Sequence, residues 1–213
     1  MTTNLRSLLT SAAATVALAT SSNAALFITG VFDGPLSGGT PKVVELYAST
    51  EIADLSTYTV DYYFNANATS SLTVPLSGSA AAGQYFYLTP NATEFGDYFG
   101  FAADYTGGSI NGDDSIVLLN SAVSVDVFGM PGTDGTGLSW EYLDGWAYRK
   151  NNTGPSTTFS DADWIFSGIN ATDGDSTNAT SGSPFPIGTF AVPEPSIALL
   201  SALGVIGLVR RRR

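Results

Sequence analysis

The sequence predicts an all-β domain, an antiparallel sandwich or barrel, lying between two short apolar ends. Large apolar and polar residues alternate through residues 58–64, which is the period of a strand with one buried face. Short segments rich in β-branched and aromatic residues recur along the chain, and turn sequences of Gly, Asn and Asp separate them. This spacing is typical of a sandwich or barrel.

The expected strands are nine segments in chain order: residues 26–32, 43–47, 58–64, 71–76, 84–88, 115–119, 123–127, 145–149 and 164–166. In the seventh segment Val123, Val125 and Val127 alternate with Ser124 and Asp126. The alternation predicts that the valines face the core.

Segments outside the strands have weaker signals. One or two turns of helix are expected at residues 93–99. From residue 169 to residue 185 the chain consists mainly of Asn, Thr, Gly, Ser and Asp, with almost no apolar residue. This composition predicts a long surface loop or the start of a linker.

Residues 1–24 predict a signal peptide. Arg6 supplies the positive start, residues 8–19 are apolar and small, and Ser22-Asn23-Ala24 supplies the small residues that signal peptidase requires. We therefore expect cleavage between Ala24 and Ala25. The alternative is a short buried helix at the start of a cytoplasmic domain.

The last residues combine a short apolar helix with a basic block. Residues 197–209 form an uncharged run of 13 residues, directly followed by Arg210, Arg211, Arg212 and Arg213. As a helix the run would cover about 20 Å, against a hydrocarbon core of about 30 Å. It is a poor permanent span, whereas the arginines hold their flank on the cytoplasmic side. A buried terminal helix is the alternative, but it leaves the arginine block unexplained.

The chain between these ends is strongly acidic. Residues 25–192 contain 18 acidic residues against three basic ones, Lys42, Arg149 and Lys150, a net charge of −15. Such a surface repels nucleic-acid phosphates and anionic lipid headgroups, so nucleic acid is excluded as a partner. Because the chain has no cysteine, its core must stabilise the fold without disulfides.

The C-terminal tail resembles the PEP-CTERM sorting signal. Val192-Pro193-Glu194-Pro195-Ser196 precedes the apolar run and the arginine block, so motif, short span and basic end occur in order. Exosortases of Gram-negative bacteria that make exopolysaccharide recognise such tails. The resemblance implies an exported protein with an inner-membrane intermediate held through residues 197–209. It also implies processing at or next to Pro193, Glu194 and Pro195, and a final location at the cell surface, the outer membrane or the extracellular matrix.

The domain is similar to the lamin tail domain in six segments, in order: residues 27–31, 43–47, 52–60, 82–88, 112–119 and 125–129. That family implies an immunoglobulin-like sandwich without catalytic residues. The family's closing Thr-Pro-Gly and Asn element is missing, because Trp164 is followed by Phe166-Ser167-Gly168. The identity of the last strand therefore stays open.

Catalytic residues are scarce. The chain has no histidine and no cysteine, so the commonest general base, the thiol nucleophile and the usual zinc ligands are missing. Residues 137–141 lack the second glycine of a nucleophile elbow. Pairs of carboxylates of the glycosidase type occur by chance in any acidic chain. We expect a protein that is not an enzyme.

Calcium is a candidate cofactor. Asp113 and Asp114, and Asp173 and Asp175, offer oxygen ligands in glycine-containing loops. Neither stretch has the spacing of an EF-hand, and solvated turns explain the same residues.

Aromatic residues suggest a sugar-binding surface as an alternative to core packing. Trp140, Tyr142, Trp146 and Tyr148 alternate with smaller or polar residues and could stack on sugar rings. The inner face of a sandwich would show the same pattern. We favour the core for Trp146 and Trp164 and leave Trp140 open.

Together these patterns predict four regions: a signal peptide (1–24), a lamin-tail-like sandwich (25–168), a polar loop or linker with room for a last strand (169–191) and a sorting tail (192–213). The expected role is a non-enzymatic surface or matrix protein in biofilm or exopolysaccharide association or adhesion. A Ca²⁺-dependent carbohydrate-binding module and an extracellular hydrolase are the alternatives. The expected partners are signal peptidase, an exosortase-type enzyme, the inner membrane, and exopolysaccharide or other surface proteins.

Overall fold

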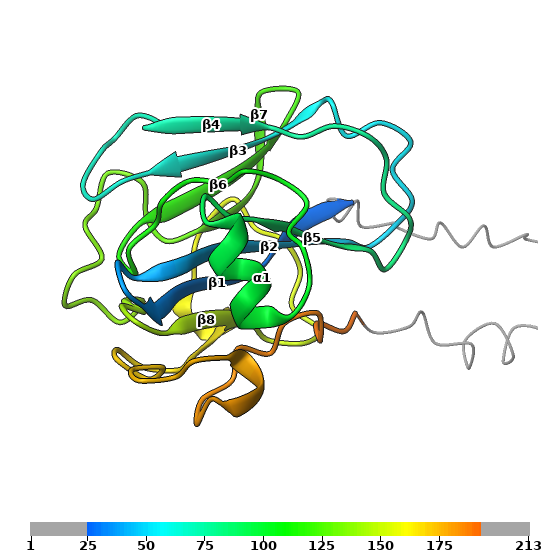
Figure 1. Cartoon of the computed structure of the whole chain (residues 1–213). Coiled ribbons are helices and arrows are strands. Elements are labelled where there is room, and N and C mark those ends of the chain that lie inside the picture. The colour runs from blue at the N-terminus through cyan, green and yellow to red at the C-terminus, as the bar shows by residue number, and fades with distance from the viewer. Residues whose placement is uncertain (1–24, 193–213) are drawn as a thin grey trace, which may run out of the picture.

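Two antiparallel sheets stack face to face over residues 25–192, the part of the chain that the computed structural model describes (Figure 1). The first sheet has the strand order β5 (Tyr85–Leu88), β2 (Thr40–Ala48), β1 (Leu26–Leu36), β8 (Trp146–Arg149) and β9 (Trp164–Phe166). The second has the order β4 (Leu72–Pro75), β3 (Tyr58–Tyr63), β6 (Ser115–Asn120) and β7 (Val123–Phe128). The predicted all-β sandwich is confirmed. Each of the nine expected segments coincides with a strand.

Helix is limited in this part of the chain. The helix α1 (Ala92–Phe99) lies where one or two turns were expected, and two 3-10 turns, η1 (Asp161–Asp163) and η2 (Asn178–Thr180), lie in loops. No helix among residues 25–192 is long and apolar enough to cross a bilayer. The predicted helices at residues 1–24 and 197–209 lie outside the described residues.

The main core fills the space between the two sheets. In β3 the side chains of Tyr58, Val60 and Tyr62 are buried, whereas Thr59 and Asp61 are partly exposed. The period of two that predicted this strand therefore corresponds to one buried face. Leu118 of the neighbouring strand β6 and Ile28 of β1, in the facing sheet, belong to the same core.

The strand β1 is buried on both faces. Leu26 and Ile28 belong to the main core, while Phe27 and Phe32 belong to a second aromatic cluster on the outer face of the five-stranded sheet. A strand that is covered on both sides has a nearly continuous apolar sequence. This explains why the segment shows no clean alternation.

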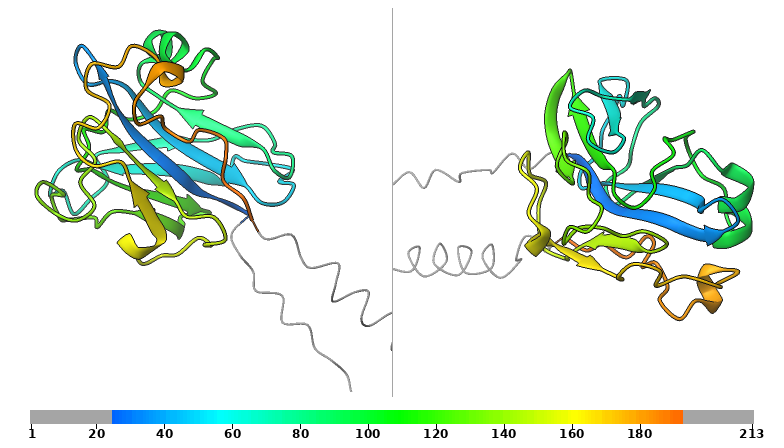
Figure 2. Two further views of the ribbon diagram at one scale, coloured as in Figure 1. Left: turned by 90° about the horizontal axis from the view of Figure 1, so that it is seen from below. Right: turned by 90° about the vertical axis from the view of Figure 1, so that its left-hand side faces the viewer.

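The outer face is covered by α1 and by the irregular chain that precedes the tail (Figure 2). Phe95 and Tyr98 of α1 are buried in the second cluster together with Phe185 and Phe190. Residues 169–191, predicted as a polar loop or linker, thus contain two buried aromatic side chains. The folded body continues beyond the predicted boundary at residue 168.

The prediction that the valines of residues 123–127 face the core holds for Val125, which packs against the main core, and Val127, which is buried, but is wrong for Val123. Val123 is 65% exposed, whereas Asp126, expected on the polar face, is fully buried. A register shift between Leu118 and Leu119 interrupts the pairing of β6 with β7. An ion pair with Arg149 compensates the burial of the Asp126 carboxylate, so that this polar side chain is buried beside Val127.

The two ends of the described chain leave the same end of the sandwich (Figures 1 and 2). Phe27, near the start of β1, packs edge-on against Phe190, with ring centroids 5.3 Å apart. Both segments that the sequence assigns to the membrane, residues 1–24 and 197–209, therefore join the domain at one end.

Candidate functional sites

The C-terminal chain of the folded body is held to the outer face of the five-stranded sheet over residues 183–192, which we call the strap. Aromatic burial supplies one part of the attachment: Phe185 and Phe190 are 1% and 4% exposed. Gly30 of β1 makes room for the first ring, because a Cβ there would lie 2.5 Å from Cζ of Phe185. The sequence of β1 is thus adapted to a docked strap.

Polar contacts hold the strap at its far end. The backbone N–H groups of Thr189 and Phe190 both donate to the Tyr148 hydroxyl, at 3.0 and 2.9 Å. The N–H of Gly188 donates to Oε2 of Glu45 at 2.7 Å, and the Tyr148 hydroxyl donates to Oε1 of Glu45 at 2.9 Å. One buried carboxylate and one hydroxyl therefore hold three consecutive backbone N–H groups.

The attachment extends to the last residues of the described chain. The Tyr85 hydroxyl donates to the carbonyl of Phe190 at 2.7 Å. The Ala191 N–H donates to Oδ1 of Asn151, and the Asn152 N–H donates to the carbonyl of Ala191. Ala191, two residues before Pro193, is thus fixed through both of its backbone polar groups.

Glu45 is a buried carboxylate whose three partners are all neutral donors. Thr29 donates its hydroxyl to Oε1 at 2.6 Å, and the other two donors are Tyr148 and Gly188. Burial raises the pKa of Glu45 to about 7, and these hydrogen bonds partly oppose the shift. The same burial, with the nearby carboxylate, raises the pKa of Tyr148 above its ordinary value.

A second buried carboxylate, Asp126, connects the two sheets. Its Oδ2 accepts from Nη2 of Arg149 at 2.6 Å and from the N–H of Ile28 at 2.8 Å. The guanidinium also donates through Nε to the carbonyl of Ile28, and it lies 4.6 Å from the ring centre of Trp164. With every polar neighbour paired in this way, the cluster has a structural role.

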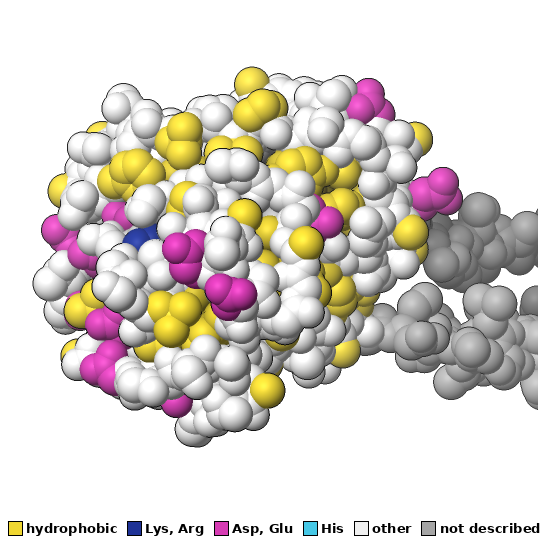
Figure 3. Space-filling view, viewed as in Figure 1, with side chains coloured by type: hydrophobic (Ala, Val, Ile, Leu, Met, Phe, Trp, Pro, Cys, Tyr) yellow, Lys and Arg dark blue, Asp and Glu magenta, His cyan; other side chains and the backbone are white. Residues whose placement is uncertain are grey.

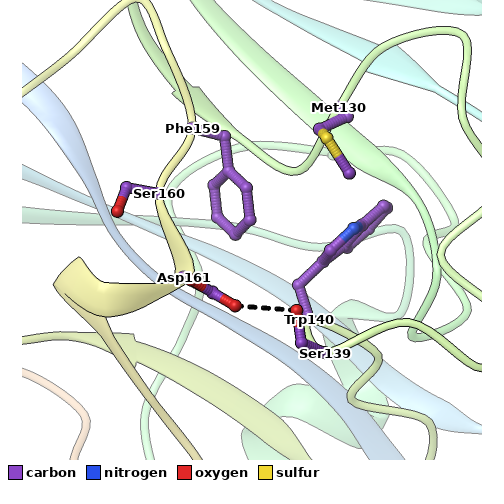
Figure 4. Close-up of a pocket in the computed structure, with 6 residues that line it drawn as sticks. All are labelled: Met130, Ser139, Trp140, Phe159, Ser160 and Asp161. Atoms are coloured by element: carbon purple, nitrogen blue, oxygen red, sulfur yellow. Dashed lines mark hydrogen bonds between the residues drawn. The ribbon is translucent and has the colours of Figure 1, made fainter.

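An open pocket of about 320 Å³ lies beside this region, between the loop after β7 and the chain around η1 (Figure 4). Trp140, Phe159 and Met130 form its apolar side. The Ser139 hydroxyl donates to Oδ2 of Asp161 at 2.7 Å at its polar side. Aromatic rings beside hydroxyl and carboxylate groups are surfaces on which a sugar ring can pack and hydrogen-bond.

The four alternating aromatics do not form an exposed platform. Trp140, Tyr142 and Tyr148 are buried, so the open question on Trp140 is answered in favour of the core. Trp164 is buried as expected. Trp146 is only partly buried, against the outer cluster, and donates from Nε1 to the carbonyl of Ser183.

The calcium candidates at Asp113 and Asp114 already have protein donors. The Thr136 hydroxyl donates to Asp113 at 2.8 Å, and the Asn65 N–H donates to Asp114 at 2.6 Å. Burial raises the pKa of Asp114 to about 6. Gly112 begins this turn at φ +87°, where a Cβ would lie 2.4 Å from Cα of Leu143, so the position requires glycine.

The second pair of calcium candidates, Asp173 and Asp175, lies in the irregular chain before the strap. Asp173 is exposed, and one carboxylate oxygen of Asp175 is buried without a hydrogen-bond partner. Within residues 25–192, no three or more acidic side chains are grouped in a way that could hold a metal ion.

The sorting and processing residues lie at the edges of the described chain. Ala25 is the first described residue, and its carbonyl accepts the Ser49 N–H at 2.7 Å. Ala24, Pro193, Glu194, Pro195 and Arg210 to Arg213 lie outside the described residues. Sequence reasoning missed Glu45 and Gly30 and named Tyr148 only as one of the alternating aromatics, since a strand that is buried on both faces gives no periodic signal for its outward side chains.

Comparison with known proteins identifies the tail. Residues 191–213 match the family model of the PEP-CTERM protein-sorting motif. The chain therefore carries the sorting signal of an exported protein that is processed by an exosortase-type enzyme during membrane-associated sorting in Gram-negative bacteria. No curated protein and no solved structure matches the chain. The resemblance of the domain to the lamin tail domain stays a prediction.

Proposed function

We propose that this protein is a non-enzymatic component of the bacterial cell surface or extracellular matrix, where its sandwich associates with exopolysaccharide. The observation that carries the proposal is the attachment of a PEP-CTERM sorting motif to a folded, acidic sandwich. The acidic side chains are dispersed over the surface among neutral ones, as one face illustrates (Figure 3). Such a surface favours solubility and contact with neutral or hydrated polymers over contact with polyanions.

Processing of the tail is the first part of the proposal. Exosortase-type cleavage at or next to Pro193-Glu194-Pro195 would remove residues 197–213 and release the domain from the inner membrane. Glu194→Ala should leave an uncut protein in that membrane. Mass spectrometry of the surface-located protein decides the matter, because an intact Arg213 terminus would contradict removal of the tail.

Association with polysaccharide is the second part. The pocket lined by Met130 and the partly exposed Phe159 supports a carbohydrate ligand by its size and by the hydroxyl and carboxylate groups of Ser139 and Asp161, while Trp140 contributes a largely buried ring. Purified mature protein should be retained by matrix polysaccharide from the producing bacterium. Because Ser139 and Asp161 are exposed, Ser139→Ala with Asp161→Asn should reduce retention without loss of the fold. Ser79→Ala, at an exposed loop residue, is the matched control.

The two alternatives are tested on the same material. Loss of retention in EDTA would favour the Ca²⁺-dependent carbohydrate-binding module, with Asp173 and Asp175 as the first residues to replace. Release of sugar products that Asp161→Asn abolishes would favour the hydrolase. Retention that is insensitive to EDTA, without turnover, is the outcome expected for the matrix protein.

A further inference from the structure

The position of the strap determines how far the sorting motif can lie from the folded body. Ala191 is fixed at both of its backbone polar groups, and Pro193 follows two residues later. An extended chain spans at most about 3.6 Å per residue, so Pro193 lies within about 7 Å and Pro195 within about 14 Å of Ala191. The motif is therefore confined close to the end of the sandwich while the strap is docked.

This confinement conflicts with the space that a processing enzyme needs. The headgroup layer on one side of a bilayer is about 5–8 Å deep, and a single helix of an enzyme is about 10 Å wide. The six residues from Ala191 to Ile197 span at most about 22 Å, so beyond the headgroups only about 15 Å remains between a docked domain and the membrane, little more than the width of one helix. If the strap leaves the sheet as far back as Ser183, the free chain before Pro193 grows from two residues to ten. Pro193 can then lie up to about 36 Å from Ser183.

We propose that the strap is a tether that restrains processing, and that the sorting enzyme gains access to the motif when residues 183–192 leave the five-stranded sheet. The proposal rests on the proposed function, since it assumes cleavage at or next to Pro193-Glu194-Pro195. The Tyr148 hydroxyl, the Glu45 carboxylate and Asn151 are the groups that set how readily the strap leaves. None of them belongs to the motif itself.

The contacts between the strap and the five-stranded sheet indicate that the sheet is adapted to hold the strap. Gly30 leaves space for Phe185, and Tyr148 both accepts two strap N–H groups and connects them to Glu45. Ser183 is held as well, through the Trp146 indole. Polar contacts are thus distributed over the whole length of the strap, so that release of its last residues alone lengthens the free chain only slightly.

Two substitutions loosen the strap by removing single polar groups. Tyr148→Phe removes one hydroxyl, and with it two strap hydrogen bonds and the hydrogen bond donated to Glu45, but keeps the ring whose centroid lies 5.5 Å from that of Phe185. Asn151→Ala removes the acceptor for the Ala191 N–H at an exposed position. Tyr105→Phe is the matched control, because its hydroxyl donates to the carbonyl of Ser77, which is not part of the strap.

The test is a pulse-chase measurement on the full chain, expressed with its exosortase-type enzyme. The rate of conversion from uncut to cut protein should rise about tenfold in Tyr148→Phe and about threefold in Asn151→Ala, and stay unchanged in Tyr105→Phe. Eight Gly and Ser residues inserted between Val192 and Pro193 of the wild type should raise the rate of cutting by a comparable factor, because they lengthen the free chain before the motif. The insertion should add little to Tyr148→Phe.

Hydrogen exchange of peptides covering residues 183–192 reports the strap directly. Faster exchange in Tyr148→Phe together with faster cutting supports the tether. Faster exchange with unchanged or slower cutting overturns it, and unchanged exchange in both variants overturns the assignment of these hydrogen bonds. Glu194→Ala separates the two proposals: if this variant is still cut, the proposed processing fails, whereas an uncut Glu194→Ala beside an unaffected Tyr148→Phe refutes the tether alone.

Discussion

At the scale of single residues, two of the buried carboxylates, Asp126 and Glu45, are stabilised in opposite ways. Asp126 is neutralised by Arg149 at 2.6 Å, while Glu45 is stabilised only by neutral donors. A buried charge without a counter-ion shifts its pKa, whereas a buried pair loses much stability when one partner is removed. The two residues should therefore respond differently to pH and to substitution.

Glu45 should make the domain less stable as the pH rises. Its pKa in the folded state is about 7, above the ordinary value of 4.5, so the folded state binds this proton more tightly than the unfolded state does. The contribution is complete below about pH 4.5 and is lost as the pH rises through about 7, on the order of 3 kcal/mol. Urea unfolding of the wild type should show this loss between pH 5 and pH 8.

Glu45→Gln cannot ionise, so the difference in unfolding free energy between pH 5 and pH 8 should shrink in this variant. Glu51→Gln is the control, because Glu51 is exposed and should leave the difference unchanged. An equal pH dependence of the wild type and Glu45→Gln would show that Glu45 is not the titrating group.

Asp126→Ala should destabilise the domain by about 3–5 kcal/mol, because it leaves the Arg149 guanidinium buried without its counter-ion. Lys150→Ala is the comparison. Its ammonium group is exposed and donates to a single loop carbonyl, so its loss should change the unfolding free energy by about 0.5 kcal/mol or less. Chemical denaturation of the two variants measures both values, and similar losses would argue against a special role of the pair.

At the scale of elements, the strands were predictable where one face is buried and the other is not. The alternation of Tyr58, Val60 and Tyr62 identified β3 and its buried face. The same reasoning failed for Val123 and Asp126 of β7, because a side-chain pattern cannot reveal that Asp126 has a buried partner on the other sheet. The strap was not predictable either. Its two aromatics, Phe185 and Phe190, are separated by the sequence Pro-Ile-Gly-Thr, whose proline and glycine indicate a loop.

The candidate sites show the same limit. The sorting motif is a local sequence of fixed order, so the tail could be identified from the chain alone. The strap contacts join Gly30, Glu45 and Tyr148 of three strands to a segment more than 30 residues further on. Such contacts depend on the arrangement of the strands, which local sequence patterns do not encode.

Gly30→Ala should weaken the docking of the strap. The added methyl group would meet the Phe185 ring and should cost about 1–3 kcal/mol of stability, the usual cost of overpacking. Phe185→Ala removes the ring, so Gly30→Ala should cost much less in that background. A double-mutant cycle by thermal or chemical unfolding measures this coupling. Additive effects would mean that the two residues do not meet.

At the scale of the whole molecule, the sandwich forms a body with both membrane-related segments at one end. Ala25 and Val192 leave this end, and contacts such as that of Phe27 with Phe190 hold the two chain ends together. A protein inserted in the inner membrane through its tail would thus present this end to the bilayer. The acidic surface of the remainder would face the periplasm.

The net charge makes a prediction about partners. With 18 acidic residues against three basic ones, the domain of residues 25–192 should not retard duplex DNA or RNA at physiological salt. Two of the bases are engaged in ion pairs, Lys42 with Asp33 and Arg149 with Asp126. Electrophoretic mobility shift at several salt concentrations is the measurement. Salt-dependent retardation would contradict the exclusion of nucleic acid.

The extent of the folded body leads to a last prediction, since residues 169–192 cover the outer aromatic cluster. A chain of residues 25–168 would expose the side chains that Phe185 and Phe190 now bury, among them Phe27 and Phe32. Burial of one such ring is worth about 1.5–3 kcal/mol. The shorter chain should therefore unfold at a lower temperature than residues 25–192, bind a dye for exposed apolar surface and aggregate at lower concentration. Equal melting temperatures of the two chains would show instead that the sandwich is complete at Gly168 and that the strap is only attached to it.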